Sequence, residues 1–336
     1  MRFFSPSAVA FVCLATVPLF AQKKNPERSG YDRAARATVL HTANVYASAD
    51  SADPPIATVT PGHEVVVTAK NGNWVNVFAN TDEKEEDPDT APEFTDPHTH
   101  PDPSAGWVRD KGIVGPRTPQ GDIILFGAAA ELEAQATEPH APKGAAESAG
   151  LLYRRVWEYF PESTLAPTAA FRSADIRWQL EKTDNSTLPS ASEANNFLRP
   201  QIYEGALKRV MKNYPDSPDA ARAAFDLLDN KVCGDWQGLP KCPEMETNLY
   251  LKYADRYHGG PKAAEALYDA TFRQGALVTM YLVDEDKKRS DAAAKNCQAI
   301  ADRMSKEYPQ SEYTDRAESI AFRVGQGISV YGSDRD

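Results

Sequence analysis

The sequence is poor in the residues and motifs that mark the commonest enzyme sites. It has only six His among 336 residues, with no Gly-x-Ser-x-Gly elbow, phosphate-binding loop or dinucleotide fingerprint. His63-Glu64 is followed by Val67 where a zinc metalloprotease helix needs its second His. We therefore expect a protein without catalytic residues, cofactor or metal, although two distant catalytic carboxylates would leave no sequence pattern.

Positive charge is also scarce. Lys and Arg total 37 against 48 Asp and Glu, which gives a formal net charge of -11 at pH 7. Nucleic-acid binding needs clustered Lys and Arg to neutralise phosphates, and the chain has no basic stripe. We therefore expect an acidic protein that does not bind nucleic acid.

Long apolar runs are confined to the N-terminus. Residues 1–21 consist of a basic second residue and an apolar run that ends at Ala21, the pattern of a secretory signal peptide. We place cleavage after Ala21, with residues 22–35 as a flexible leader. A retained anchor is the alternative, but Ser and Pro interrupt the run. No later segment is long and apolar enough to span a bilayer, so we expect a secreted or periplasmic protein.

Cysteine is rare, and signal cleavage would leave three. Cys233 and Cys242 bracket a loop with two Gly and one Pro between two helical segments, a spacing that favours a disulfide in an oxidising compartment. A zinc site is the weaker alternative, because neither Cys has a second ligand pair nearby. Cys297 lies at helical spacing with Ile300 and Met304, which predicts a buried apolar residue.

Four copies of a short pattern organise the C-terminal half. Each copy starts with an aromatic residue after a helical run, and three of the four continue with Pro and end in Ser; the copies begin at Phe160, Tyr214, Tyr257 and Tyr308. Counted from the fourth residue of each copy, the third and sixth positions are small: Ala166, Ala220, Ala263 and Thr314, then Ala169, Ala223, Ala266 and Ala317.

This pattern predicts antiparallel helix pairs. Pro disfavours helical geometry in the residue before it, so each helix ends at the aromatic residue. Ser217 or Ser311 can then cap the next helix, and the small residues let the two helices approach closely. Stacked pairs make an α-solenoid with a concave face. An ordinary helical domain with four similar helix ends is the alternative.

The Tyr-Pro-x-Ser-x-x-Ala-x-x-Ala pattern resembles the tetratricopeptide-like (TPR-like) repeats of envelope assembly lipoproteins and periplasmic coordinator proteins. The resemblance covers residues 145–328, with residues 329–336 as a tail, and the copies are spaced by more than the roughly 34 residues of a tetratricopeptide unit. It implies a groove that binds protein or peptide, and it brings no active site.

Residues 36–115 have a different period. Short runs rich in Val alternate with Pro-Pro, Pro-Gly and Asn-Gly turn signals, which predicts a small all-β barrel. The order of Asn44-Val45, a Val-rich strand and a closing Gly106-Trp107-Val108 resembles a bacterial SH3-type (SH3b) domain. Tyr46 replaces the family's usual Arg. The resemblance implies a peptide or cell-wall ligand, with Tyr46, Trp74 and Trp107 as candidate binding residues; the alternative is that both Trp fill the barrel core.

An acidic, Pro-rich insert occupies residues 80–104 of this domain. Its composition predicts a segment that does not order itself. His98 and His100 lie within it and could offer imidazole ligands to zinc or copper, but we expect a solvated loop without preformed metal geometry. Residues 116–144 then supply a helix from about Gln120 to Ala136 and a Pro- and Gly-containing linker, and residues 182–195 are expected to form a loop between repeat helices.

The sequence therefore predicts a multidomain β + α protein, an SH3-like barrel followed by a TPR-like solenoid. We expect a non-catalytic binding or scaffold protein of the bacterial cell envelope, with an envelope protein or peptide, or peptidoglycan, as partner. One alternative is an assembly factor in which the barrel only caps the solenoid. Another is a cell-wall hydrolase that its barrel targets to the substrate.

Overall fold

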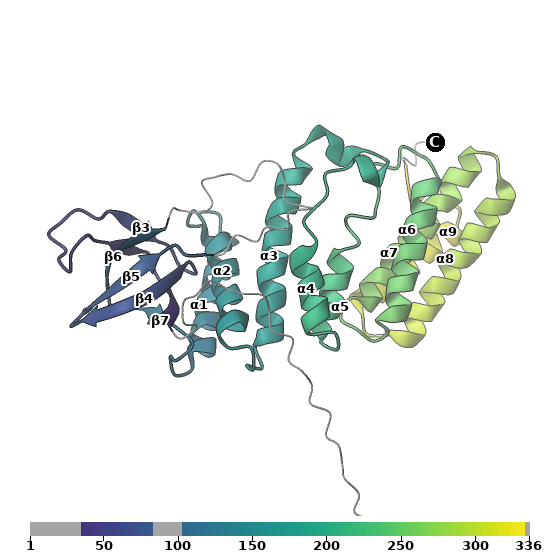
Figure 1. The fold of residues 1–336 in the computed structure, drawn as a ribbon. Helices are drawn as coiled ribbons and strands as arrows, with labels where there is room; N and C mark the ends of the chain where they lie inside the picture. The colour runs from purple at the N-terminus through teal and green to yellow at the C-terminus, as the bar shows by residue number, and fades with distance from the viewer. Residues whose placement is uncertain (1–34, 83–102, 333–336) are drawn as a thin grey trace, which may run out of the picture.

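The computed structural model describes residues 35–82 and 103–332. The signal peptide, almost all of the leader, His98 and His100 lie outside these residues, so the predictions made for them stay predictions. Figure 1 shows the architecture: a small antiparallel β-domain at one end, followed by helices that stack side by side in chain order. This is the predicted arrangement of a β-domain followed by a helical repeat domain.

The described part of the β-domain contains seven short strands. The main antiparallel sheet has the order β6-β5-β4-β1-β7, and a second, two-stranded sheet pairs β2 with β3. The strands are β1 (Arg36–Val39), β2 (Ala43–Val45), β3 (Ala57–Val59), β4 (Glu64–Asn71), β5 (Trp74–Ala79), β6 (Ser104–Arg109) and β7 (Ile113–Val114). A bridge between Tyr46 and Trp107 joins the two sheets.

Strand alternation explains the core of the β-domain. Successive side chains of a strand point to opposite faces, so every second residue can be apolar and buried. Val65 of β4, Val77 of β5 and Val108 of β6 are each fully buried in one cluster. Gly72 has a φ of 57° in the turn between β4 and β5, where glycine adopts the left-handed geometry at no steric cost.

The helical part begins with α1 (Gly121–Ala136), close to the predicted helix, and continues through four antiparallel pairs. The paired helices are α2 (Ala145–Tyr159) and α3 (Ala166–Ser186), α4 (Gly205–Asn213) and α5 (Pro218–Asp226), α6 (Lys241–Arg256) and α7 (Ala263–Val283), and α8 (Lys287–Glu307) and α9 (Glu312–Gly325). Among the described residues, no helix is both long and apolar enough to cross a membrane.

The four aromatic residues form the turns within these pairs, as predicted. Phe160, Tyr214, Tyr257 and Tyr308 are the C-caps of α2, α4, α6 and α8. The Ser217 hydroxyl accepts a hydrogen bond of 3.1 Å from the Ala220 backbone N–H at the start of α5. The small residues at the sixth position are all fully buried: Ala169, Ala223, Ala266 and Ala317. The turns lie at one end of the pairs, and the connections between pairs lie at the other.

The connection from α3 to α4 is more ordered than predicted. The expected loop over residues 182–195 is partly helical, because α3 continues to Ser186 and short 3-10 turns follow at η3 (Pro189–Ser192) and η4 (Asn196–Leu198). The guanidinium of Arg199 holds this segment by donating hydrogen bonds to the carbonyls of Ala191, Asp229 and Val232. Backbone carbonyls that would otherwise be unpaired thus gain a charged donor.

Candidate functional site

The three predicted aromatic residues lie together on the β-domain. Trp74 is on β5 and Trp107 on β6, where they pair in register with Arg109 and Asn76 respectively. The alternate residues of these strands fill the hydrophobic cluster, so the two Trp side chains lie on the opposite, outer face of the sheet. Both Trp residues are therefore outside this hydrophobic cluster, although Trp74 is itself buried.

Tyr46 completes this outer aromatic face. Its backbone N–H and carbonyl exchange hydrogen bonds of 2.9 and 2.7 Å with Trp107, and its ring meets the edge of Trp74 at a centroid distance of 5.5 Å. The guanidinium of Arg109 stacks on Trp74 at 3.9 Å, which leaves that side chain only 8% exposed. Tyr46 and Trp107 are half-buried, so they are the members of the trio that a ligand can reach.

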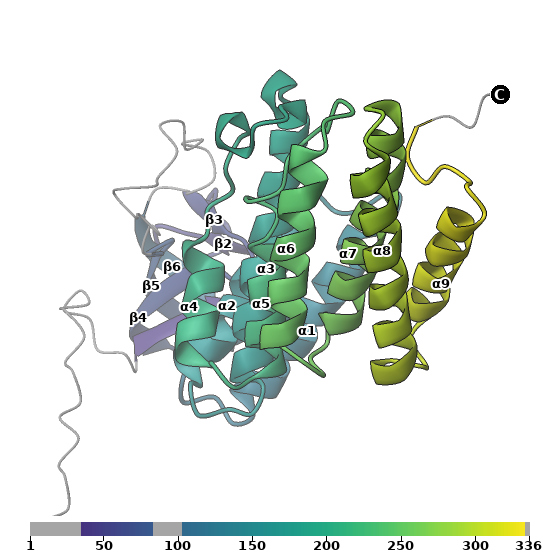
Figure 2. The same ribbon diagram turned by 90° about the vertical axis from the view of Figure 1, so that its right-hand side faces the viewer.

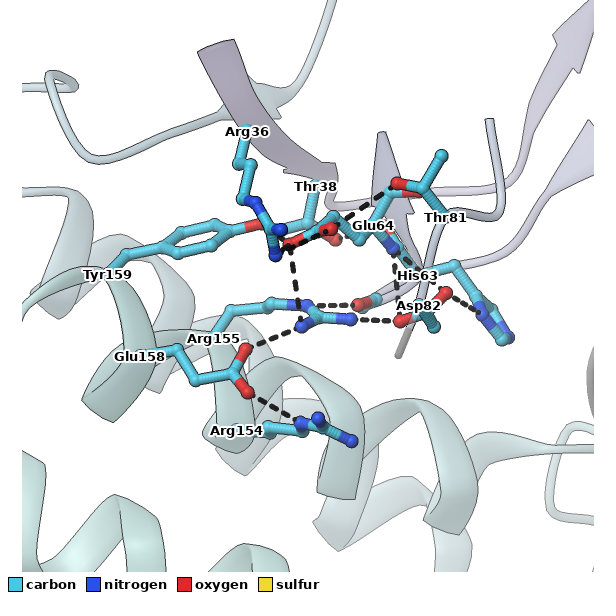
Figure 3. Close-up of polar contacts among 11 residues, drawn as sticks. Arg36, Thr38, His63, Glu64, Thr81, Asp82, Arg154, Arg155, Glu158 and Tyr159 are labelled. Carbon is cyan, nitrogen blue, oxygen red and sulfur yellow. Dashed lines mark hydrogen bonds and ion pairs between the residues drawn. The ribbon is translucent and has the colours of Figure 1, made fainter. Parts of the chain in front are cut away.

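A second cluster, which sequence reasoning missed, joins the β-domain to the helices. Figure 3 shows Arg155 of α2 among side chains and carbonyls of the β-domain. Its Nε donates a hydrogen bond of 2.9 Å to the Gly62 carbonyl, and its terminal nitrogens form ion pairs with Asp82 and, at 2.5 Å, with Glu158. The side chains of Arg155 and Asp82 are 2% and 6% exposed, so this ion pair is largely removed from water.

Glu64 is the third carboxylate of this cluster, beside Asp82 and Glu158. Arg36 lies 3.2 Å from one of its oxygens, and Thr81 donates a hydrogen bond of 3.3 Å to the same oxygen. Burial raises the pKa of Glu64 above its ordinary value, against the opposing charges of Arg155 and Arg36. Burial would also raise the pKa of Asp82, but the His63 hydrogen bond and the Arg155 charge hold it far below its ordinary value.

The position of Asp82 corrects the prediction for the start of the acidic insert. We expected a solvated residue, whereas its side chain is 6% exposed and held by Arg155. A sequence signal did exist, because Arg155 falls among Leu152, Val156 and Tyr159, which are apolar or aromatic residues at helical spacing, where a cation needs a partner. Gly62 is required at this contact, since a Cβ there would lie 2.4 Å from the Leu151 Cβ. The cluster therefore locks the β-domain onto α2.

A groove is the third candidate, and it lies in the last two helix pairs. Its volume is about 600 Å³, and it is lined by α6, α7 and α8. Figure 2 shows α7 and α8 to the right of α6. Its apolar lining comes from Leu251, Leu277 and Ile300. This size lies in the range of ligand-binding clefts.

Two ion pairs cross this groove from α8 to α6. Arg289 lies 2.8 Å from Glu244, and Arg303 lies 2.8 Å from Asp255. Tyr281 of α7 donates a hydrogen bond to Glu244, and the Arg289 guanidinium stacks on its ring at 4.4 Å. The carboxylates hold both guanidinium groups, so the groove between the two ion pairs offers little net charge.

The predicted disulfide is present and joins the loop after α5 to the first turn of α6. Cys233 and Cys242 are bonded, with their Cα atoms 6.0 Å apart. Within the loop that they close, the Trp236 indole donates a hydrogen bond of 3.2 Å to the buried Glu246 carboxylate, and its ring packs 5.4 Å from Tyr331 of the tail. The bridge thus fixes a loop on which the C-terminal segment rests.

Cys297 is fully buried, as predicted, and burial raises the pKa of its thiol to about 12, so it is not poised to act as a nucleophile. Within residues 35–82 and 103–332, no three His, Cys, Asp or Glu side chains form a group that could hold a metal ion.

Comparison with known proteins places this chain in no family. No protein-family model matches it, and no curated protein does. Among solved structures, it is similar to a de novo designed helical repeat protein, DHR64, with 18% identity and a TM-score of 0.23, over 62% of this chain and 94% of that one. A structure titled DHF79 filament has 16% identity and a TM-score of 0.21, over 60% and 96% of the two chains. At such low TM-scores these similarities support no conclusion about function.

Proposed function

We propose that this chain is a non-catalytic binding or scaffold protein of the bacterial cell envelope, secreted or periplasmic. The observation that carries the proposal is the groove of about 600 Å³, an open cleft lined by α6, α7 and α8. In this proposal the helical part is a TPR-like solenoid that holds a protein partner. The β-domain is an SH3-type domain whose outer aromatic face contacts peptide or peptidoglycan.

The groove and the aromatic face are tested together by a pull-down. The chain from residue 22 is immobilised and exposed separately to purified peptidoglycan and to a detergent-solubilised envelope extract. Trp107→Ala removes one of the two accessible rings of the aromatic face, and Ala299→Arg fills the groove from an exposed position on α8. Gln298→Ala, on the same helix but not among the groove-lining residues, is the matched control.

We expect Ala299→Arg to abolish retention of a protein partner and Trp107→Ala to abolish retention on peptidoglycan, with Gln298→Ala behaving as the parent chain. Retention of a partner that Ala299→Arg leaves unchanged would rule the groove out as its binding site. If neither material is retained, the binding proposal fails as a whole.

The Arg155 cluster favours a second role for the β-domain, that of a cap. The first pair of a solenoid needs a cover for its apolar outer side, and α1 and the β-domain occupy that position in Figure 1. Residues 36–115 and 116–336 produced as separate fragments test this role. Loss of folded structure in the second fragment supports a cap, whereas two independent melting transitions that together match the intact chain would contradict it.

A further inference from the structure

We propose that the Cys233–Cys242 disulfide controls a C-terminal strap, residues 327–331, and that reduction of the disulfide by a dithiol releases the strap from α7. The inference goes beyond the proposed binding function and does not depend on what the groove holds. It is carried by a chain of contacts that runs from Cys233 through Glu246 and Trp236 to Tyr331.

The strap turns sharply after α9 and packs against α7. Gly327 has a φ of 74°, and the Ile328 backbone N–H donates a hydrogen bond of 2.9 Å to the Arg323 carbonyl. On α7, a Cβ added to Gly275 would lie 3.2 Å from a methyl group of Val330. The strap therefore lies close against α7 at a position that has no side chain.

The end of the strap rests on the loop between α5 and α6. The Tyr331 ring lies 5.4 Å from the Trp236 ring, and the Trp236 ring lies 5.9 Å from Phe272 of α7. Aromatic rings at such centroid distances attract one another beyond the effect of burial alone. The position of Trp236 therefore decides whether Tyr331 has a fixed surface to pack on.

The loop that carries Trp236 has little regular structure of its own. Residues 227–240 contain neither helix nor strand, and Gln237 has a φ of 52°, in the left-handed region that residues other than Gly seldom adopt. One oxygen of the buried Glu246 carboxylate holds the loop at two points. It accepts hydrogen bonds of 2.9 Å from the Cys233 backbone N–H and 3.2 Å from the Trp236 indole.

The remaining backbone contacts of the loop lead away from α6. The backbone N–H groups of Gly234 and Asp235 donate hydrogen bonds of 3.0 Å each to carbonyls of the α3–α4 connection, those of Glu193 and Ser192. These bonds do not tie the loop to α6. The disulfide is thus the covalent part of the link between the loop and α6, and Glu246 is the polar part.

The Cys233 sulfur is the one that a reductant can attack, because Cys233 is half-buried whereas Cys242 is 8% exposed. A thiolate of the dithiol bonds to Cys233 and breaks the disulfide, which releases Cys242 as a thiolate. The second thiol of the reductant then attacks the mixed disulfide, releases Cys233 and leaves the reductant as an internal disulfide. Two electrons pass to the protein, and each cysteine takes up one of the two protons that the dithiol gives up.

Breaking the bond displaces Cys233 rather than Cys242. Two unbonded sulfur atoms cannot stay in bonding contact, so one of the two residues must move. Cys242 is buried in the first turn of α6, whereas Cys233 lies in the loop. Movement of Cys233 withdraws its N–H from Glu246 and loosens Trp236, which shares the same oxygen. Tyr331 then loses its fixed partner, and the strap detaches.

Hydrogen–deuterium exchange tests the inference on the oxidised chain from residue 22. The peptide that covers residues 323–332 is followed by mass spectrometry before and after incubation with a dithiol under native conditions. We expect its exchange to become about tenfold faster or more after reduction, because the strap opens locally. Residues 296–304 of α8 should exchange at an unchanged rate. Cys233→Ala combined with Cys242→Ala should exchange like the reduced chain, with or without the dithiol.

Tyr331→Ala separates the strap from the disulfide. In this variant the strap should exchange fast in the oxidised chain, and the dithiol should add little. Phe322→Ala is the matched control, because it removes a ring that is 67% exposed on α9, and it should behave as the parent chain. Unchanged exchange of the strap in a chain whose two thiols are shown to be free would overturn the inference. Equal acceleration in residues 296–304 would also overturn it, since reduction would then loosen the whole domain.

Discussion

Arg155 of α2 donates a hydrogen bond of 2.9 Å from Nε to the backbone carbonyl of Gly62 in the β-domain. The two residues are 93 positions apart in the chain, and the guanidinium is 2% exposed. This contact and the neighbouring ion pairs make the β-domain and the first helix pair one packed unit. Four predictions follow from this interface and from the other buried groups.

Arg155→Met should lower the free energy of unfolding by about 3–5 kcal/mol, because it removes the buried cation that Asp82 and Glu158 share. Urea denaturation followed by circular dichroism measures the effect. Arg316→Ala is the control, since its ion pair with Glu312 is solvent-exposed and should contribute less than about 1 kcal/mol. Equal losses in the two variants would contradict a structural role for Arg155.

Asp226 should make stability depend on pH. Burial, together with the neighbouring Asp175 and Asp229, raises its pKa to about 7, and its Oδ2 atom has no hydrogen-bond partner. Between about pH 4 and pH 7 the folded chain holds a proton that the unfolded chain releases, so this residue's contribution to stability falls as pH rises and is constant above that range.

Asp226→Asn removes this titration. The free energy of unfolding of the variant should be close to that of the parent chain at pH 4 and should exceed it by roughly 2 to 4 kcal/mol at pH 8. Chemical denaturation at a series of pH values measures the difference, with Asp291→Asn on the exposed side of α8 as control. A difference that does not vary with pH would show that Asp226 is ionised at neutral pH.

The disulfide should stabilise the helical domain. Replacing both Cys233 and Cys242 by Ala should lower the free energy of unfolding by roughly 2.5 to 3 kcal/mol, because the unfolded chain regains the entropy of a closed loop. Thermal unfolding with and without a dithiol reductant measures the same effect in the parent chain. The melting temperature of the double variant should not change with the reductant. A change in that variant would show that the reductant acts on the protein by a route other than this disulfide.

Replacement by Ala should lower the free energy of unfolding by different amounts at the two Trp residues of the aromatic face. Trp74 is 8% exposed beneath Arg109 and Tyr46, so Trp74→Ala should lower the free energy of unfolding by about 3 kcal/mol or more. Trp107 is half-buried, so Trp107→Ala should lower the free energy of unfolding clearly less than Trp74→Ala does. Denaturant unfolding of the two variants makes the comparison, and the reverse order of stability would show that the exposed ring is Trp74.

The helix pairs could be predicted from short sequence patterns. The aromatic turns, the Ser217 cap and the buried Ala at the sixth position are each specified within a few residues of the chain, where sterics and capping decide the structure. The predicted disulfide followed in the same way from two nearby Cys in one loop.

The site residues that were missed depend on contacts distant in sequence. Asp82 has the acidic, Pro-rich neighbourhood of a solvated segment, and only its meeting with Arg155 explains its burial. The ion pairs of the groove likewise join α6 to α8, and no local pattern states which Arg faces which carboxylate. What the sequence did contain was the seven-residue spacing of Arg289, Asn296 and Arg303, which places all three on one side of a helix.

All four aromatic turns lie at one end of the helix pairs, and this has a consequence for how the chain can change in length over evolution. Residues gained or lost in the connections at the opposite end alter the spacing between copies without moving a turn. The uneven intervals between Phe160, Tyr214, Tyr257 and Tyr308 reflect both these connections and helices that range from 9 residues in α4 to 21 residues in α7. During evolution, such a repeat can therefore change in length at the end of its helix pairs away from the aromatic turns, while the turns keep their geometry.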